Sequence, residues 1–132
     1  MANRMKSGKE HKVPLSTEAM AILESMPTGK PEDLIFSNPR GGIPSNNFLS
    51  SLLKRMGREI TTHGFRSTFK DWAREQTSYA DEITELALAH VNSDQTRAAY
   101  ARSKLIERRR LLMQEWASFC NNGQEIRTTN VI

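Results

Sequence analysis

The chain has 132 residues and a mass of 15.0 kDa, which is the length of one ordinary domain and too short for two well-packed halves. Hydrophobic residues make up 37% of it and charged residues 26%, a balance that favours a well-solvated, largely helical domain and leaves no apolar run long enough to span a membrane. The single cysteine, Cys120, excludes a disulfide framework and a paired-thiol zinc or redox site, and the net charge of +4 permits a polyanionic partner without requiring one.

The N-terminal residues predict a small two-stranded element. Residues 6–9 have the composition of a hairpin turn, and the run 13–15 after them can form an edge strand or a strand end, because Pro14 has no N–H for a central ladder. Residues 1–9 also lack the apolar run of a signal peptide, so we expect a cytoplasmic protein.

Two short helices are predicted next, each bounded by capping or breaking residues. The expected elements in this region are, in chain order, a helix from Ser16 or Thr17 to about Met26, a short buried strand or turn at 34–36, a loop at 38–42, and a helix from Pro44 or Ser45 that Gly57 ends.

A longer amphipathic helix is predicted from Thr62, as its N-cap, to about Gln76. At about 100° per residue, an aromatic stripe and a basic stripe on this helix lie more than roughly 100° apart, so the helix can bury one and expose the other. The aromatic stripe is formed by Phe65, Phe69 and Trp72. The basic stripe is formed by His63, Arg66 and Lys70.

The remaining helices predict a mainly α-helical α+β domain over residues 1–120, with five to six helices and the N-terminal β-hairpin. A helix after Ser78 carries an apolar stripe that His90 continues, so we expect His90 to be partly buried, and a short helix from Ser93 or Asp94 carries Tyr100. A last helix runs from about Ser103 to Phe119, and its apolar stripe either closes the core in cis or docks on a neighbouring protomer. Residues 121–132 are expected to be a loose tail.

Four residues stand in an order that suggests phosphoryl transfer on DNA: His63, Arg66, His90 and Tyr100. A tyrosine hydroxyl that attacks a phosphodiester needs cationic donors for the charge on phosphorus and a proton donor for the leaving oxygen. Taken singly, each residue has an ordinary structural explanation, as part of a solvated helix face, a core histidine or a packing tyrosine. Tyr79, the only other tyrosine, precedes His90 and is assigned to packing or a loop.

With their flanking residues, these positions resemble the tyrosine recombinase family, in particular phage and genomic-island integrases, over nearly the whole chain. The matching segments are Lys6-Ser7-Gly8-Lys9, Val13-Pro14-Leu15, Thr62-His63-Gly64-Phe65-Arg66-Ser67-Thr68-Phe69, Leu88-Ala89-His90, Ala98-Ala99-Tyr100, Arg109-Arg110, Met113-Gln114 and Trp116. Their joint order and spacing indicate part of the family's C-terminal catalytic domain.

The resemblance implies site-specific recombination or integration, by cleavage and rejoining of double-stranded DNA without a metal or nucleotide cofactor. Tyr100 would form a 3′-phosphotyrosyl link and release a 5′-hydroxyl. Arg66 would bind the non-bridging phosphate oxygens, and His90 would support the same oxygens. His63 would donate to the phosphate or exchange a proton with Tyr100.

The same resemblance places the general acid on the N-terminal turn, where Lys6 matches best and Lys9 is the alternative, although both can be ordinary solvated residues. The residues expected to bind DNA are Lys9, Lys70, Arg40 and Arg102. Other protomers are the expected protein partners, in a tetramer on DNA for the full-length protein, which would be bacterial or phage-encoded.

The chain departs from the family pattern at its N-terminal side. Family members carry another catalytic arginine well before the lysine hairpin, whereas only Arg4 precedes Lys6 here, and the DNA-clamping domain is not present. We therefore expect these residues alone to be inactive or very slow and to bind DNA weakly. The alternatives are a non-catalytic remnant or regulatory DNA-binding module, and a plain helical interaction module.

Overall fold

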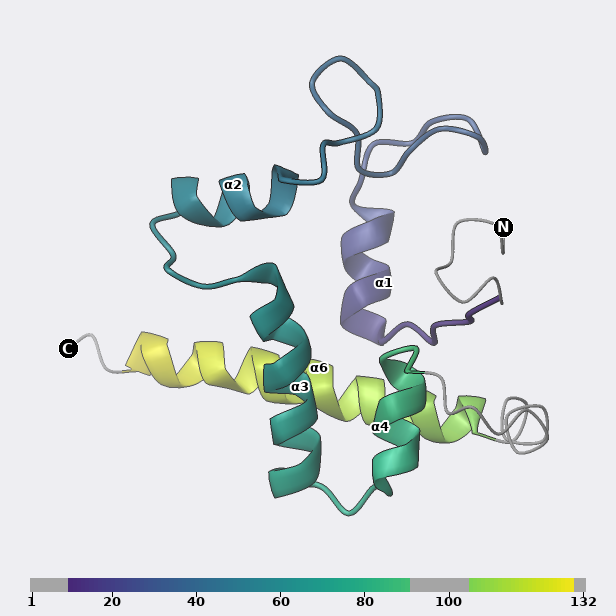
Figure 1. Ribbon diagram of the computed structural model, residues 1–132, viewed down its shortest axis with the longest axis vertical. Helices are drawn as coiled ribbons and strands as arrows, with labels where there is room; N and C mark the ends of the chain where they lie inside the picture. The colour runs from purple at the N-terminus through teal and green to yellow at the C-terminus, as the bar shows by residue number, and fades with distance from the viewer. Residues whose placement is uncertain (1–9, 91–104, 130–132) are drawn as a thin grey trace.

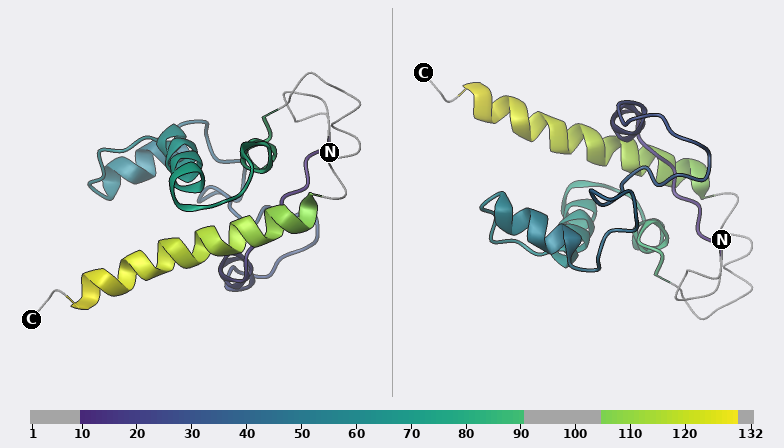
Figure 2. Two further views of the ribbon diagram at one scale, coloured as in Figure 1. Left: turned by 90° about the horizontal axis from the view of Figure 1, so that it is seen from below. Right: turned by 90° about the horizontal axis from the view of Figure 1, so that it is seen from above.

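The computed structural model describes residues 10–90 and 105–129, with side chains up to Asn122. Its elements are, in chain order, α1 (Thr17–Glu24), α2 (Phe48–Arg55), α3 (Thr62–Gln76), α4 (Asp81–Ala87) and α6 (Ile106–Thr129). Figure 1 shows α3 and α4 crossing the long α6, with the loops that precede α2 at the opposite end of the molecule from α4. In Figure 2, α1 lies on one side of α6, and α3 and α4 lie on the other, so α6 separates two layers.

Capping residues set several of the helix bounds that the sequence predicts. The Ser16 hydroxyl accepts a hydrogen bond from the Ala19 N–H at 3.1 Å, so Ser16 is the N-cap of α1. Gly57 follows α2 with a φ of +68°, a left-handed conformation that favours glycine and ends the helix. Both residues confirm the predicted boundaries.

The core forms where α3, α4 and α6 meet. Its buried side chains are Phe69, Trp72, Ala73, Ile83 and Leu112. The ring of Trp116 from α6 lies 5.0 Å from that of Trp72 and 5.5 Å from that of Phe69, the latter edge-on at 76°. The described part of α6 therefore packs in cis, one of the two arrangements that the sequence left open.

The aromatic stripe of α3 is only partly buried. Phe69 and Trp72 lie in the core as predicted, but Phe65 is 55% exposed, so its predicted burial is wrong. Phe65 is on the first turn of α3, which extends past α6 towards α2 (Figure 1). Amphipathic spacing identifies a face that can be buried, but the place where the partner helix crosses that face decides how much of it is covered.

Long-range polar contacts attach the N-terminal segment to α6. The Gln114 side-chain oxygen accepts from the Thr17 N–H at 2.9 Å, and its amide nitrogen donates to Glu18 at 2.8 Å. Earlier in the segment, the Lys12 carbonyl accepts a hydrogen bond from Nη1 of the buried Arg109 at 2.9 Å. α1 and the chain before it are thus held mainly by side chains of one distant helix.

The structure does not support the predicted β-hairpin. Its expected turn at 6–9 lies outside the described residues, and no strand is present in residues 10–90 or 105–129. Residues 10–15 form no regular secondary structure: Pro14 has no N–H to donate, and the Lys12 carbonyl binds Arg109 instead of a partner strand. The described chain is therefore mainly α, without the expected β part.

Two further predictions differ from the structure. Leu34, Ile35 and Phe36 form a bend with 43%, 57% and 56% exposure, because they lie beyond α1 where no described element covers them. At the other end of the chain, α6 continues from the expected stop at Phe119 to Thr129, where the sequence predicted a loose tail. Residues after Phe119 have no sustained apolar period, but they contain no proline, and adding residues to an existing helix is far easier than starting one.

Candidate functional site

The first predicted site helix, α3, begins at a hydroxyl cap. The Thr61 hydroxyl accepts from the Gly64 N–H at 3.0 Å, so the N-cap is Thr61, one residue before the predicted Thr62. This cap places His63 and Arg66 on the first turns of α3, three residues apart and therefore on neighbouring parts of one face. Both side chains are exposed.

His90 is placed by the turn that ends α4. The Ala89 N–H donates to the Leu86 carbonyl at 3.1 Å, and the His90 N–H donates to the Glu85 carbonyl at 2.9 Å, which is the paired pattern of a Schellman motif. Ala89 has a φ of +57°, the left-handed conformation that this motif requires. The turn brings His90 back beside α4, where its side chain remains 48% exposed rather than continuing the buried stripe.

We expect Ala89→Gly to stabilise the chain by about 1 kcal/mol, because the alanine Cβ strains a left-handed residue and glycine removes that strain. The midpoint of urea unfolding, followed by circular dichroism, should rise with an unchanged slope. Ala87→Gly, inside α4, is the matched control and should lower stability by about 0.5–1 kcal/mol. A lower midpoint for Ala89→Gly would contradict the assignment of the motif.

Arg66 and His90 are joined across the α3–α4 pair. The Arg66 Nη2 donates to the Leu88 carbonyl at 2.6 Å and lies 2.9 Å from the His90 Nε2. Both contacts use the same nitrogen of Arg66. The structure thus brings together Arg66 and His90, which are 24 positions apart in the sequence. A guanidinium and an imidazole thus meet on an exposed surface.

Lys70 and Glu85 lie behind this pair. Lys70, one turn after Arg66 on α3, forms an ion pair with one carboxylate oxygen of Glu85, and the other oxygen contacts the His90 Nδ1. The hydrogen bond from Lys70 lowers the pKa of Glu85 more than burial raises it, and the contact with His90 lowers this pKa further. Arg66, His90, Glu85 and Lys70 form one connected chain of polar groups.

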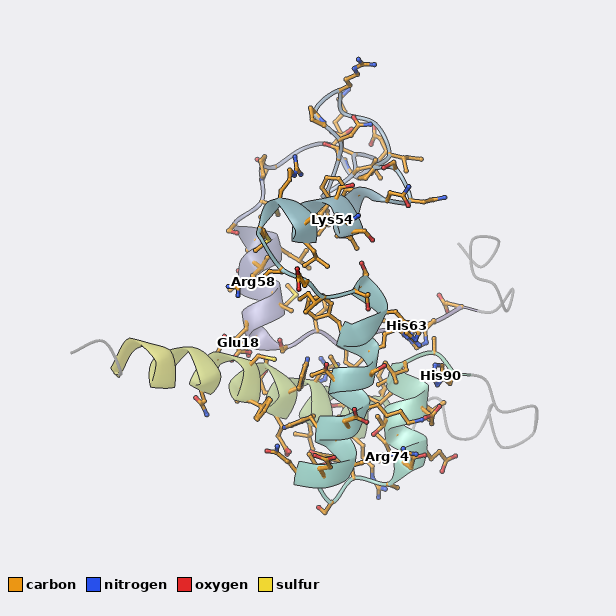
Figure 3. All side chains as sticks on the ribbon, turned by 60° about the vertical axis from the view of Figure 1, so that its left-hand side comes forward. Glu18, Lys54, Arg58, His63, Arg74 and His90 are labelled. Atoms are coloured by element: carbon orange, nitrogen blue, oxygen red, sulfur yellow. The ribbon has the colours of Figure 1, made fainter. Side chains whose placement is uncertain are left out.

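The other predicted site residues are not joined to this chain of groups. Among the described residues, no hydrogen bond links His63 to Arg66 or His90, although Figure 3 shows both histidines on the same side of the molecule. Arg40 is exposed on the loop that the Asn38 side chain closes by accepting from the Arg40 and Gly42 N–H groups. Four predicted residues lie outside the described part: Lys6, Lys9, Tyr100 and Arg102.

His11 and Arg109 are two further polar residues in partly apolar surroundings. Partial burial and the nearby Arg109 guanidinium lower the pKa of His11, against a smaller opposing effect of the Ala87 main chain. Arg109 is 6% exposed, and its Nε has no hydrogen-bond partner within the described residues. Glu85 was not predicted from the sequence. The one feature that distinguishes it in the sequence is that it is the only charged residue in 83–89.

Tyr79 occupies a packing position, as predicted. It packs against the core, and its hydroxyl donates to a carboxylate oxygen of Glu115 on α6 at 2.7 Å. Burial and this hydrogen bond raise the pKa of Tyr79 to about 12, so the phenol stays protonated at neutral pH. These contacts make Tyr79 a poor nucleophile and a suitable control for Tyr100.

In residues 10–90 and 105–129, no group of three or more histidine, cysteine or acidic residues is arranged to hold a metal ion. None of the helices described is both long and apolar enough to cross a membrane.

The chain is similar over most of its length to proteins that phages and prophages encode. Prophage integrase IntA of Escherichia coli (strain K12) is 40% identical over 121 residues, which cover 88% of this chain and 29% of the relative. The integrase of Enterobacteria phage P4 is 33% identical over 123 residues, with 87% and 28% covered. The integrase of Shigella phage Sf6 is 32% identical over 124 residues, with 89% and 32% covered.

The chain belongs to the phage integrase family. It spans about three-tenths of the length of these integrases. No family model and no solved structure matches it. Within this integrase segment, the joined residues Arg66 and His90 are two of the positions that carry the resemblance to tyrosine recombinases, and the structure adds Glu85 and Lys70 to them.

Proposed function

We propose that the chain is part of the catalytic region of a site-specific DNA recombinase, which cuts and rejoins double-stranded DNA through Tyr100. The observation that carries the proposal is the contact between Arg66 and His90, which places a guanidinium beside an imidazole at an exposed surface. Similarity to proteins named integrases supports the same function. The full-length protein would act as a tetramer of protomers on DNA, in the cytoplasm of a bacterial host.

In the proposed reaction, the Tyr100 oxygen forms a bond to phosphorus, and the bond from phosphorus to the 5′ oxygen breaks. The phenol proton leaves to a base, for which His63 is the candidate, and the leaving oxygen takes a proton from Lys6 or Lys9. Arg66 supplies the fork of N–H groups that matches two non-bridging oxygens. Its contacts to Leu88 and His90 use only Nη2, so Nε and Nη1 are not used by those two contacts.

The charge near the proposed phosphate comes mainly from Arg66. Lys70, although basic and predicted to bind DNA, is ion-paired with Glu85, with 26% of its side chain exposed. A paired lysine contributes less to phosphate binding than a free one, because the carboxylate already neutralises it. In this proposal Lys70 supports the site from behind, and Arg66 makes the phosphate contact.

The test is a titration of the chain with a short generic duplex, followed by amide NMR at low and then higher salt. We expect shifts concentrated at 62–70 and His90 that diminish with salt, because phosphate binding releases counterions. Arg66→Gln should weaken binding and reduce the salt slope by about one unit. Arg74→Gln is the matched control: Arg74 is on the same helix, at the opposite end from His63 in Figure 3, and pairs with Asp81 at 3.0 Å.

Equal losses for the two variants would show that binding depends on net charge and not on this site. Absent or scattered shifts with the wild-type chain would favour the alternative, a non-catalytic module of an integrase. Arg74→Gln changes net charge by the same amount as Arg66→Gln, so only a difference between them supports the proposed phosphate contact.

A further inference from the structure

Among residues 10–90 and 105–122, Glu85 is the one acidic group in contact with Arg66, His90 or Lys70. It lies in the second half of α4 with 21% of its side chain exposed, and its two oxygens bind different partners. One oxygen pairs with Lys70 of α3, and the other contacts the His90 Nδ1. Its own main-chain carbonyl accepts from the His90 N–H at 2.9 Å. Glu85 thus holds both the backbone and the ring of His90.

The hydrogen-bonding partners of the His90 ring permit a single neutral tautomer. A guanidinium nitrogen can only donate, so the His90 Nε2, 2.9 Å from the Arg66 Nη2, must accept. A neutral imidazole then carries its proton on Nδ1, and this N–H donates to the Glu85 carboxylate, which can only accept when ionised. Lys70 keeps Glu85 in that ionised form.

We propose that Glu85 is a positioning residue that fixes the ring orientation and the Nδ1–H tautomer of His90. This inference rests on the proposed function, because a fixed ring directs its Nε2 to the proposed phosphate that Arg66 also contacts. When a phosphate replaces the Arg66 contact, His90 can take a solvent proton on Nε2 and donate it to a phosphate oxygen. Nδ1–H stays on Glu85 throughout, so the ring does not need to turn, and the carboxylate stabilises the charged imidazolium.

Lys70 has a defined place in this arrangement. It lies on α3 one turn from Arg66, so the Lys70–Glu85 pair links the helix that carries Arg66 to the helix that precedes His90. Glu85 therefore contacts both parts of the proposed phosphate site: α3, through Lys70, and the turn after α4, through His90. No other acidic residue contacts the His90 ring among the described residues.

The test is a two-bond ¹H–¹⁵N correlation spectrum of the histidine rings at neutral pH, with His90 assigned by comparison with His90→Gln. The wild-type chain should show a protonated-type Nδ1 and an unprotonated-type Nε2 for His90. Glu85→Met, which keeps the length of the side chain but removes the acceptor, should convert this single tautomer into a mixture of both. Glu82→Met is the matched control, because Glu82 is exposed on the first turn of α4, and it should leave the His90 signals unchanged.

Arg66→Gln separates the influence of Glu85 from that of Arg66. With Glu85 intact, the Nδ1–H tautomer should persist in Arg66→Gln, because the carboxylate still requires a donor. An Nε2–H tautomer in the wild type, or a tautomer that survives Glu85→Met but not Arg66→Gln, would overturn the proposal. If Glu85→Met does not fold, Glu85→Gln serves in its place, and it should lower the Nδ1–H share because an amide accepts more weakly than a carboxylate.

This experiment needs no DNA, so its outcome is separate from that of the proposed function. If the tautomer is fixed and depends on Glu85, but residues 62–70 do not respond to duplex DNA, Glu85 positions His90 for something other than a DNA phosphate. A DNA response at 62–70 with an unfixed His90 ring would retain the proposed function and reject the role of Glu85.

Discussion

Tyr100→Phe should abolish covalent attachment of the chain to DNA. Phenylalanine keeps the ring but has no oxygen to bond to phosphorus, so no 3′-phosphotyrosyl link can form. The measurement uses a pool of duplexes of randomised sequence, each nicked so that the short strand released by cleavage diffuses away. Each cleavage event is then trapped, which allows even a slow reaction to accumulate product on a denaturing gel, and mass spectrometry of the digested adduct identifies the linked residue.

Tyr79→Phe is the control for this experiment. It removes the only other phenol of the chain, one whose hydroxyl donates to Glu115, and it should leave the adduct yield unchanged while costing about 1 kcal/mol of stability. An adduct that persists in Tyr100→Phe would reject Tyr100 as the nucleophile. No adduct from the wild-type chain, together with the localised DNA response described above, would identify a DNA-binding module without cleavage activity.

Leu112→Ala should cause a large loss of stability. Leu112 is 0% exposed and lies where α6 meets α3 and α4. Removing a buried leucine costs the transfer free energy of its carbons plus that of the cavity left behind, about 2–5 kcal/mol. Because an ordinary domain has only about 5–15 kcal/mol in total, this change should unfold much of the chain near room temperature or lower its melting temperature strongly.

Leu111→Ala is the matched control for that change, since Leu111 is the adjacent residue in the same helix and is 59% exposed. The same substitution there should alter stability by less than about 0.5 kcal/mol. Urea unfolding of both variants, followed by tryptophan fluorescence, measures the difference, because Trp72 and Trp116 lie in the affected core. Equal losses would mean that α6 does not pack on α3 and α4 through the Leu112 face.

Local features were predictable from the sequence where a single residue determines them. The Ser16 cap and the Gly57 stop depend on one hydroxyl and one left-handed turn, and the span of α3 follows from its aromatic period. Predictions failed where the structure of a segment depends on a residue far away in the sequence. The Lys12 carbonyl binds Arg109, 97 residues away, and no local pattern indicates that this side chain takes the place of a partner strand.

The candidate site was predicted as separate residues rather than as a connected group. His63, Arg66 and His90 were identified by order and spacing, and the structure joins Arg66 to His90. Glu85 was missed because its partners are 15 residues before it and five after it, and neither separation corresponds to neighbouring positions on one helix. The predicted roles of Tyr100 and Lys6 stay predictions, since both residues lie outside the described part.

The attachment of α1 to α6 also bears on how the chain folds during synthesis. Thr17 meets Gln114 across 97 residues, so α1 leaves the ribosome long before the helix that holds it exists. α3 and α4 are close in sequence and can pair early, whereas α1 must wait until α6 has been made. Ile22 and Leu15 are exposed even in the finished structure, so during that interval they are open to aggregation or to chaperones.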